Sequence, residues 1–137
     1  MIQVTTTWLD GIHFVSEDEG GHALEMDGSP EFGGQLKGFT PKKVLLSALA
    51  GCTGMDVVSI LRKMQVDFDH FSMTTEGDVA SDDPKVMTHI RLVYRFKGQN
   101  LPVDKIERAV QLSQEKYCAI SAMLRKSTVL DYSILME

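Results

Sequence analysis

The sequence predicts a single α+β domain over residues 1–137 in which most strands pair antiparallel. Three observations support this fold class. Period-2 alternation marks strands at both ends of the chain and in its middle, apolar helical segments lie between them, and the strands come in runs. The expected order of elements is βββααββααβ. A length of 137 residues suits one domain, since single domains cluster near about 100–150 residues.

Three short strands are expected before residue 27. Alternate residues from Ile2 to Trp8 are apolar or Thr, which is strand spacing. Asp10-Gly11 follows, and Asp-Gly between alternating segments is a strong hairpin signal. Further strands are expected over 12–16 and 22–26. Residues 27–39 are Gly-rich and have no period, so they predict a loop long enough to suggest a functional role.

An apolar helical region follows this loop. Thr40-Pro41 predicts the helix start, with Thr as the N-cap and Pro at the first helical position. Residues 41–52 are apolar nearly all round, as in a buried helix at the centre of a domain or of a dimer. Gly51 and Gly54 flank Cys52, so we expect a break there and a second helix beyond it.

The remaining elements are a hairpin, two helices and a final strand. Residues 66–80 and 86–97 are extended segments joined by the turn residues 81–84, and the second segment has the clearest alternation in the chain. Pro102 opens a helix whose apolar positions include Val103 and Tyr117, and a shorter helix begins near Cys118. Residues 130–134 alternate and predict the last strand.

Composition and charge exclude several classes of protein. The chain has 14 Lys+Arg against 19 Asp+Glu, a formal net charge of -5, which argues against a general partner of nucleic acid or of anionic membranes. The longest apolar stretch, Val44 to Cys52, is shorter than the roughly 18–20 residues of a membrane span. Residues 1–8 alternate and do not resemble a secretory signal. We therefore expect a cytoplasmic protein, with no membrane partner and with reduced cysteines.

Cys52 and Cys118 are the candidate reactive residues. Both fall at the predicted start or break of an apolar helix, where backbone N–H groups and the helix dipole favour a thiolate. A peroxidatic thiolate with a nearby resolving thiol needs two such positions. Free cysteine is also among the most buried residue types, so a plain packing role is the alternative for each.

Metal and cofactor sites have little support in the sequence. The four histidines lie in predicted strands, and no two of them have helical ligand spacing. No glycine-rich phosphate loop follows a strand and precedes a helix. We expect no metal ion and no cofactor.

Two segments carry a resemblance to a known family. The first, TPKKVLLSALAGCTGMDVV, covers residues 40–58 and contains Cys52; the second, EKYCAIS, covers residues 115–121 and contains Cys118. Together, at this spacing, they resemble the central-helix segment and the resolving-cysteine segment of the OsmC/Ohr family. The order of elements fits this family over nearly the whole chain, and the sequence is closer to its YhfA-like branch than to Ohr itself.

The resemblance implies both a fold and a reaction. It implies an intertwined homodimer in which antiparallel sheets wrap around the central apolar helix, with the active sites at the subunit interface. Cys52 would attack a small organic hydroperoxide to give a sulfenic acid, and Cys118 would resolve this acid to a disulfide. The implied reductant is a dithiol or a lipoylated protein, without metal or flavin, and the implied role is antioxidant defence against oxidative stress.

This chain departs from the family pattern at the groups that activate the thiol. The family's peroxidases place a glutamate directly after the proline, where this chain has Lys42, and they use an arginine from the N-terminal half, where this chain has none before Arg62. Lys42 lies ten residues before Cys52, on the order of 15 Å along a helix axis. The second hypothesis is therefore a non-peroxidase OsmC-like dimer that binds a small apolar ligand near Cys52.

Overall fold

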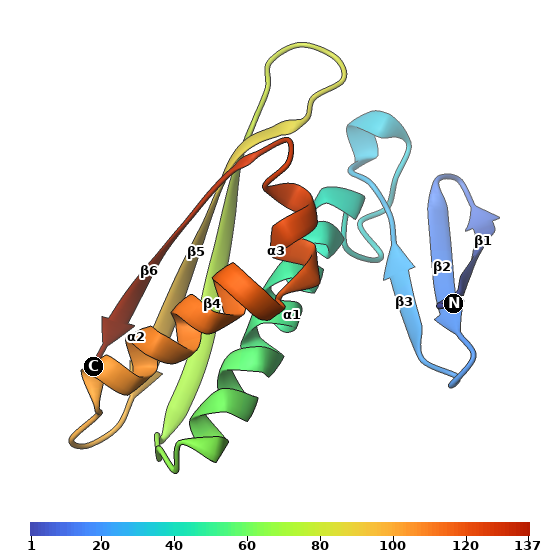
Figure 1. Ribbon diagram of the computed structural model, residues 1–137. Coiled ribbons are helices and arrows are strands. Elements are labelled where there is room, and N and C mark those ends of the chain that lie inside the picture. The colour runs from blue at the N-terminus through green and yellow to red at the C-terminus, as the bar shows by residue number, and fades with distance from the viewer. The chain divides into compact units, whose positions relative to one another are not determined.

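The computed structural model describes residues 1–137 and divides the chain into two compact units, Met1–Leu45 and Leu46–Glu137. Each unit contains one three-stranded sheet, and three α-helices accompany the sheets (Figure 1). The predicted α+β class is confirmed. That residues 1–137 form one domain stays a prediction.

The N-terminal unit is an antiparallel sheet followed by a loop. Its strands are β1 (Val4–Asp10), β2 (His13–Asp18) and β3 (Ala23–Met26), paired in the order β1-β2-β3. The predicted hairpin between the first two strands is confirmed. Gly11 takes a left-handed conformation with φ +54, and Trp8 Nε1 donates to the Gly11 carbonyl at 2.8 Å.

The predicted loop over residues 27–39 is built around one carboxylate. Apart from a single 3₁₀ turn, Pro30–Phe32, it has no helix or strand. The Asp27 side chain accepts hydrogen bonds from the backbone N–H groups of Gly28, Gln35 and Lys37 at 2.7, 3.1 and 3.2 Å. Three donors on one carboxylate fix the course of the loop.

Helix α1 (Pro41–Lys63) begins at the predicted proline and continues without a break to Lys63. The expected division into two helices at Gly51 and Gly54 is therefore wrong, and the observed order has one helix fewer there. A glycine costs only about 1 kcal/mol in a helix interior. Burial of Leu49, Val57 and Leu61 along one side of the helix outweighs that cost.

The C-terminal unit contains a mixed sheet. Strands β4 (His70–Val79) and β5 (Met87–Lys97) pair antiparallel, as predicted, whereas β6 (Val129–Met136) pairs parallel to β5. The antiparallel expectation is wrong for this last strand. The chain returns from β5 to β6 through α2 (Val103–Leu112) and α3 (Ala119–Leu124), the kind of helical crossover that parallel pairing requires (Figure 1).

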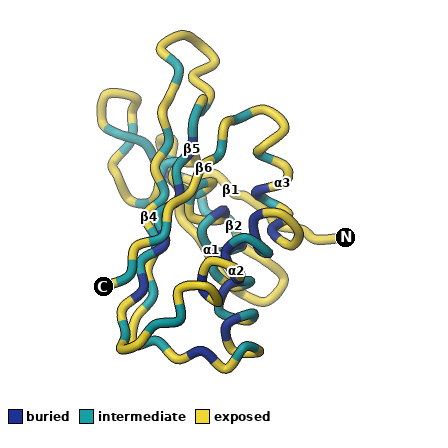
Figure 2. Tube along the Cα trace, turned by 60° about the vertical axis from the view of Figure 1, so that its left-hand side comes forward, coloured by how far each residue is buried: buried dark blue, intermediate teal, exposed yellow.

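The hydrophobic core lies within this C-terminal unit (Figure 2). Alternate side chains of β5 are fully buried, as the period-2 pattern predicts, and Phe71 stacks on Phe96 with ring centroids 4.3 Å apart. The buried core side chains that face each other come from β5, α1 and α2: Ile90, Leu92, Tyr94, Phe96, Leu49, Val57, Leu61, Ile106, Ala109 and Val110.

A π-helical turn, η2 (Ser113–Tyr117), separates α2 from α3. Its wider i→i+5 bonding changes the side-chain register of the helix. Tyr117, predicted on the apolar face that begins at Val103, is 52% exposed, and Val103 itself is exposed. Ser113 and Gln114, at the start of the turn, are buried instead.

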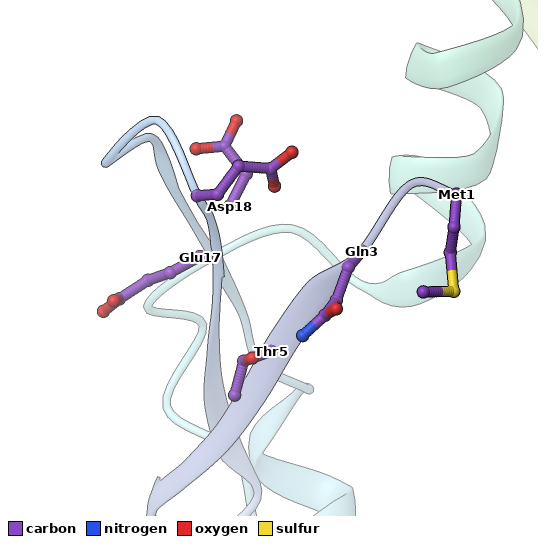
Figure 3. Close-up of a pocket in the computed structure, with 6 residues that line it drawn as sticks. Met1, Gln3, Thr5, Glu17 and Asp18 are labelled. Atoms are coloured by element: carbon purple, nitrogen blue, oxygen red, sulfur yellow. The ribbon is translucent and has the colours of Figure 1, made fainter.

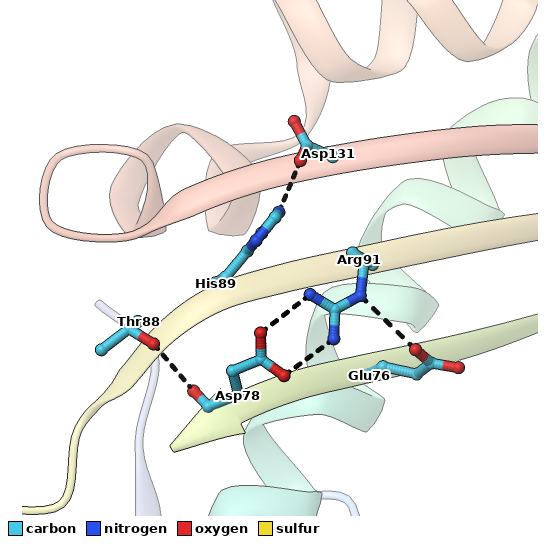
Figure 4. A network of polar contacts seen from close by, with 6 residues as sticks. All are labelled: Glu76, Asp78, Thr88, His89, Arg91 and Asp131. Carbon is cyan, nitrogen blue, oxygen red and sulfur yellow. Dashed lines mark hydrogen bonds and ion pairs between the residues drawn. The ribbon is translucent and has the colours of Figure 1, made fainter. Parts of the chain in front are cut away.

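The opposite face of the C-terminal sheet carries charged side chains (Figure 4). Arg91 donates to both carboxylate oxygens of Asp78, at 2.9 and 3.0 Å, and also to Glu76. His89 pairs with Asp131 across β5 and β6. The sheet therefore has one apolar and one ion-paired face, consistent with the alternation in β5.

Helix α1 is apolar well beyond the side that is buried. By length and by its mean hydropathy of 1.9 it could cross a membrane, a test that core helices of soluble proteins also pass. Only 22% of its apolar window is buried in this chain. The predicted all-round burial is thus not met within one copy.

Candidate functional site

The two cysteines lie in contact, although 66 residues separate them in the sequence. Cys52 comes from the middle of α1 and Cys118 from the residue before α3. Their sulfurs are 3.1 Å apart, and both thiols are free, with Cys118 Sγ donating to Cys52 Sγ. The sequence named both residues, and the fold places their sulfurs where a covalent bond between them needs only a small movement.

Cys118 is the N-cap of α3, as the sequence predicts for its position at a helix start. Its sulfur accepts hydrogen bonds from the Ser121 backbone N–H at 3.4 Å and from the Ser121 hydroxyl at 3.1 Å. Its own N–H donates to the Ser113 carbonyl at 2.8 Å. Cys118 is only 3% exposed, so it has little direct contact with solvent.

Cys52 is not at a helix start, contrary to the sequence prediction. It lies inside a continuous helix, so the N–H groups of its own helix are already used. Burial raises the pKa of the Cys52 thiol, the backbone N–H of Ile120 in α3 lowers it, and Cys118 and Asp56 raise it further. The net shift is upward, so the thiol form dominates at neutral pH.

A buried polar cluster lies next to the pair, since Thr53 follows Cys52 and the Cys118 N–H donates to Ser113. The Thr53 hydroxyl lies 2.7 Å from both the Tyr94 and the Ser113 hydroxyls, and the Gln114 amide contacts Tyr94 at 2.8 Å. Burial raises the pKa of Tyr94 to about 12, so its phenol keeps its proton. Sequence reasoning missed this cluster; the one available signal was Thr53, a polar residue within the apolar stretch of α1.

An apolar groove runs along α1 on the exposed side of the helix. It encloses about 620 Å³ and lies over the two glycines that flank Cys52. Its lining residues come from α1 and β4: Gly51, Gly54, Met55, Val58, Ser59, Arg62, Lys63 and Phe71. An apolar surface with two cations at one end suits an apolar ligand that carries a polar or anionic group.

A second hollow, of about 410 Å³, lies in the N-terminal unit (Figure 3). Gln3 and Thr5 line it from one side and the carboxylates of Glu17, Asp18 and Glu19 from the other. Neither cysteine lines this hollow or the apolar groove, but two glycines that flank Cys52 line the groove and no neighbour of a cysteine lines the hollow, so the hollow is the weaker candidate site. No group of three or more His, Cys, Asp or Glu side chains is arranged to hold a metal ion.

Comparison with known proteins gives one consistent family. A family model described as OsmC-like protein matches residues 33–133. Protein YhfA of Escherichia coli strain K12 is 34% identical over 132 residues, which cover 96% of each chain.

Solved structures agree with this family. A hypothetical protein from Aquifex aeolicus matches with a TM-score of 0.84 at 27% identity, over 100% of this chain and 98% of that one. An organic hydroperoxide resistance protein from Legionella pneumophila matches with a TM-score of 0.72 at 18% identity, over 98% of each chain. The second likeness concerns the fold alone.

Proposed function

The chain belongs to the family of OsmC-like proteins, and on this premise we propose that it is a thiol-dependent reductase of organic hydroperoxides. Cys52 is the peroxidatic residue in this proposal and Cys118 the resolving residue. One observation carries it: two free thiols from separate elements with their sulfurs 3.1 Å apart. The relatives that share the fold include organic hydroperoxide resistance proteins.

The proposed cycle has three balanced steps. The Cys52 thiolate attacks one oxygen of the hydroperoxide, the O–O bond breaks, and the alcohol leaves with the thiol's proton, giving Cys52 sulfenic acid. Cys118 then attacks the sulfenic sulfur, which releases water and forms a disulfide. A dithiol, free or lipoyl-bound, finally reduces this disulfide by exchange and is itself oxidised to a disulfide.

The surroundings of Cys52 support an organic substrate. Cys52 does not itself line the apolar groove, but Gly51 and Gly54 on either side of it do, and the lining favours an alkyl or aryl group over water-sized peroxides. The raised pKa of Cys52 makes the first step slow at neutral pH, because only the thiolate is nucleophilic. We therefore expect a modest enzyme whose rate rises with pH.

The same two observations favour the second candidate function. A thiol with a raised pKa beside an apolar groove also suits an OsmC-like dimer that binds a small apolar ligand without reducing it. Intact-mass analysis after mild oxidation distinguishes the two functions. A loss of two hydrogens per chain supports the redox protein, whereas unchanged thiols and a co-purified ligand support the binding protein.

A peroxide assay tests the proposal directly. Cumene hydroperoxide and dithiothreitol are given to the wild type, to Cys52→Ser and to Cys118→Ser. We expect Cys52→Ser to lose peroxide consumption. In a parallel reaction without dithiothreitol, Cys118→Ser should accumulate a Cys52 sulfenic acid that dimedone labels. Equal, slow consumption by the wild type and Cys52→Ser would refute the peroxidase.

We also propose that the protein is a cytoplasmic homodimer. Met55, inside the apolar groove of α1, is 77% exposed, and the groove as a whole is uncovered in one chain. A second copy would cover its open side and leave the apolar lining as one wall of a site at the subunit interface, where the substrate would bind. Sedimentation should show a dimer for the wild type, a monomer for Met55→Asp, and a dimer for Val103→Asp, which changes an exposed apolar residue outside the groove. A wild-type species of 15.2 kDa at micromolar concentration would contradict the dimer.

A further inference from the structure

A chain of hydrogen bonds runs from a guanidinium to a carboxylate beside the cysteine pair. Arg125, the residue after α3, donates from Nη1 to the Gln114 carbonyl and from Nη2 to Gln114 Oε1, both at 2.6 Å. The Gln114 amide nitrogen contacts the Tyr94 hydroxyl at 2.8 Å and Thr53 Oγ1 at 3.2 Å. The chain continues through Thr53 and Ser113, whose hydroxyl reaches Asp56 Oδ2 at 2.9 Å.

Counting the available donor protons fixes the direction of each hydrogen bond in this series. Arginine has only donors, so its contact fixes which end of the Gln114 amide is the oxygen, and the amide NH₂ must then donate to Tyr94 and Thr53. At the other end the Asp56 carboxylate can only accept hydrogen bonds, so the Ser113 hydroxyl donates to it.

The middle of the chain follows from its two ends. Because the Ser113 hydroxyl donates its hydrogen bond to Asp56, it can only accept one from the Thr53 hydroxyl. Thr53 has then used its own proton, so it must accept a hydrogen bond from the Tyr94 hydroxyl. Tyr94 can donate this hydrogen bond because its raised pKa, about 12, keeps the phenol protonated. No buried side-chain nitrogen or oxygen is left without a partner. Removing the guanidinium removes the contact that orients the Gln114 amide and holds it in this series of hydrogen bonds.

This series of hydrogen bonds connects the elements that carry the two cysteines. Thr53 follows Cys52 in α1, Ser113 and Gln114 belong to the π-helical turn that leads to Cys118, and Arg125 ends α3. Helix α3 has six residues, too few for a helix to be stable by itself. Its start is held by the bond from Cys118 N–H to Ser113, and its end by Arg125 on Gln114.

We propose that Arg125 is a positioning residue for the cysteine pair: through Gln114 it fixes the π-helical turn and α3 and so sets the distance between Cys118 and Cys52. Arg125 contacts neither sulfur, and it is not among the groups that shift the pKa of Cys52. Its effect is on geometry, and it deepens the proposed redox function. Without Arg125 the thiols meet less often and the disulfide forms less readily.

Equilibrium with glutathione tests the proposal without any peroxide. The two thiols and one oxidised glutathione give the internal disulfide and two reduced glutathiones, and the equilibrium ratio is the effective concentration of the pair. We expect Arg125→Gln to lower it about tenfold or more, since a small misplacement of reacting groups has effects of this size. Arg125→Lys keeps the charge but lacks the paired N–H donors of a guanidinium, so its effective concentration should lie between those of Arg125→Gln and the wild type.

Two further variants separate geometry from stability. Gln114→Glu leaves an acceptor for Arg125 but removes the NH₂ donors, so it should lower the effective concentration as Arg125→Gln does. Arg108→Gln, on α2 and bonded only to Gln111, should leave it at the wild-type value. Thermal melts of each variant record folding, and Arg125→Lys decides the result if Arg125→Gln does not fold.

The outcomes are distinct from those for the proposed function. A wild-type effective concentration in Arg125→Gln or, where that variant does not fold, in Arg125→Lys overturns the positioning role. An equal loss in Arg108→Gln overturns it as well. Failure of the wild type to consume cumene hydroperoxide overturns the peroxidase alone, because the glutathione equilibrium is measured without it.

Discussion

The two units of the chain have the same kind of sheet and opposite kinds of interior. In Met1–Leu45 the one buried residue is a carboxylate, Asp27, and both faces of the sheet keep exposed apolar side chains. In Leu46–Glu137 the sheet is covered by helices on one face, and its core is apolar. Strand alternation is similar in both, so alternation alone does not create a core; a second layer does.

This difference also decides where chemistry can be held. The C-terminal unit can place two sulfurs 3.1 Å apart because the elements that carry them are packed on a common core. The N-terminal unit is held by backbone bonds and by mostly exposed side-chain hydrogen bonds, with Asp27 as its one buried polar side chain. Rigid positioning of reactive groups requires the first kind of interior.

The largest expected effect is a core truncation in the C-terminal unit. Phe96→Ala removes a fully buried ring and should lower the free energy of unfolding by about 3–5 kcal/mol. Phe32→Ala, in the N-terminal unit and 72% exposed, should change it by about 0.5 kcal/mol or less. Urea denaturation compares the two. Equal losses would mean that Phe32 is covered by a surface outside its own unit, and the contrast between the units would fail.

The second largest expected effect concerns the Cys52 thiol in the C-terminal unit. Because burial raises the pKa of Cys52, its alkylation by iodoacetamide should rise continuously from pH 7 to 9, at up to about tenfold per pH unit. Mass spectrometry of the labelled peptide separates Cys52 from Cys118. A rate that levels off below pH 8 would show that the thiol is activated, against the environment described above.

Local patterns in the sequence predicted most of the elements. The alternation in β5, the start of α1 at Pro41 and the start of α3 after Cys118 all depend on neighbouring residues and were confirmed. The continuous helix through Gly51 and the parallel pairing of β6 were not predicted, since tertiary packing decides both.

The candidate site divides in the same way. The two cysteines could be named because the sequence contains only two and both have recognisable neighbours. The cluster of Thr53, Tyr94 and Gln114 could not be found, because its members are up to 61 residues apart and follow no common period. The π-helical turn that brings Gln114 inward leaves no pattern in the sequence.

A smaller effect is expected at the one buried residue of the N-terminal unit. Burial by itself would raise the pKa of Asp27, but the three backbone donors outweigh it and hold the pKa below its usual value. Asp27→Ala leaves the N–H groups of Gly28, Gln35 and Lys37 without this acceptor. Their hydrogen exchange should become on the order of tenfold faster while exchange in β5 stays unchanged. Faster exchange in β5 would show that the carboxylate stabilises more than its own loop.

The smallest effect is expected on the ion-paired face of the C-terminal sheet, opposite its core. The hydrogen bonds from Arg91 lower the pKa of Asp78 below its ordinary 3.8, so the pair stabilises the fold above that pH and loses its effect as the pH falls through the lowered value. Arg91→Gln should lower Tm by about 2 °C or less at pH 7, because the pair is exposed and screened by salt. The difference from the wild type should shrink in 1 M salt and vanish in strong acid. A larger loss of Tm that persists in 1 M salt would show that this face stabilises the fold on the scale of the apolar core.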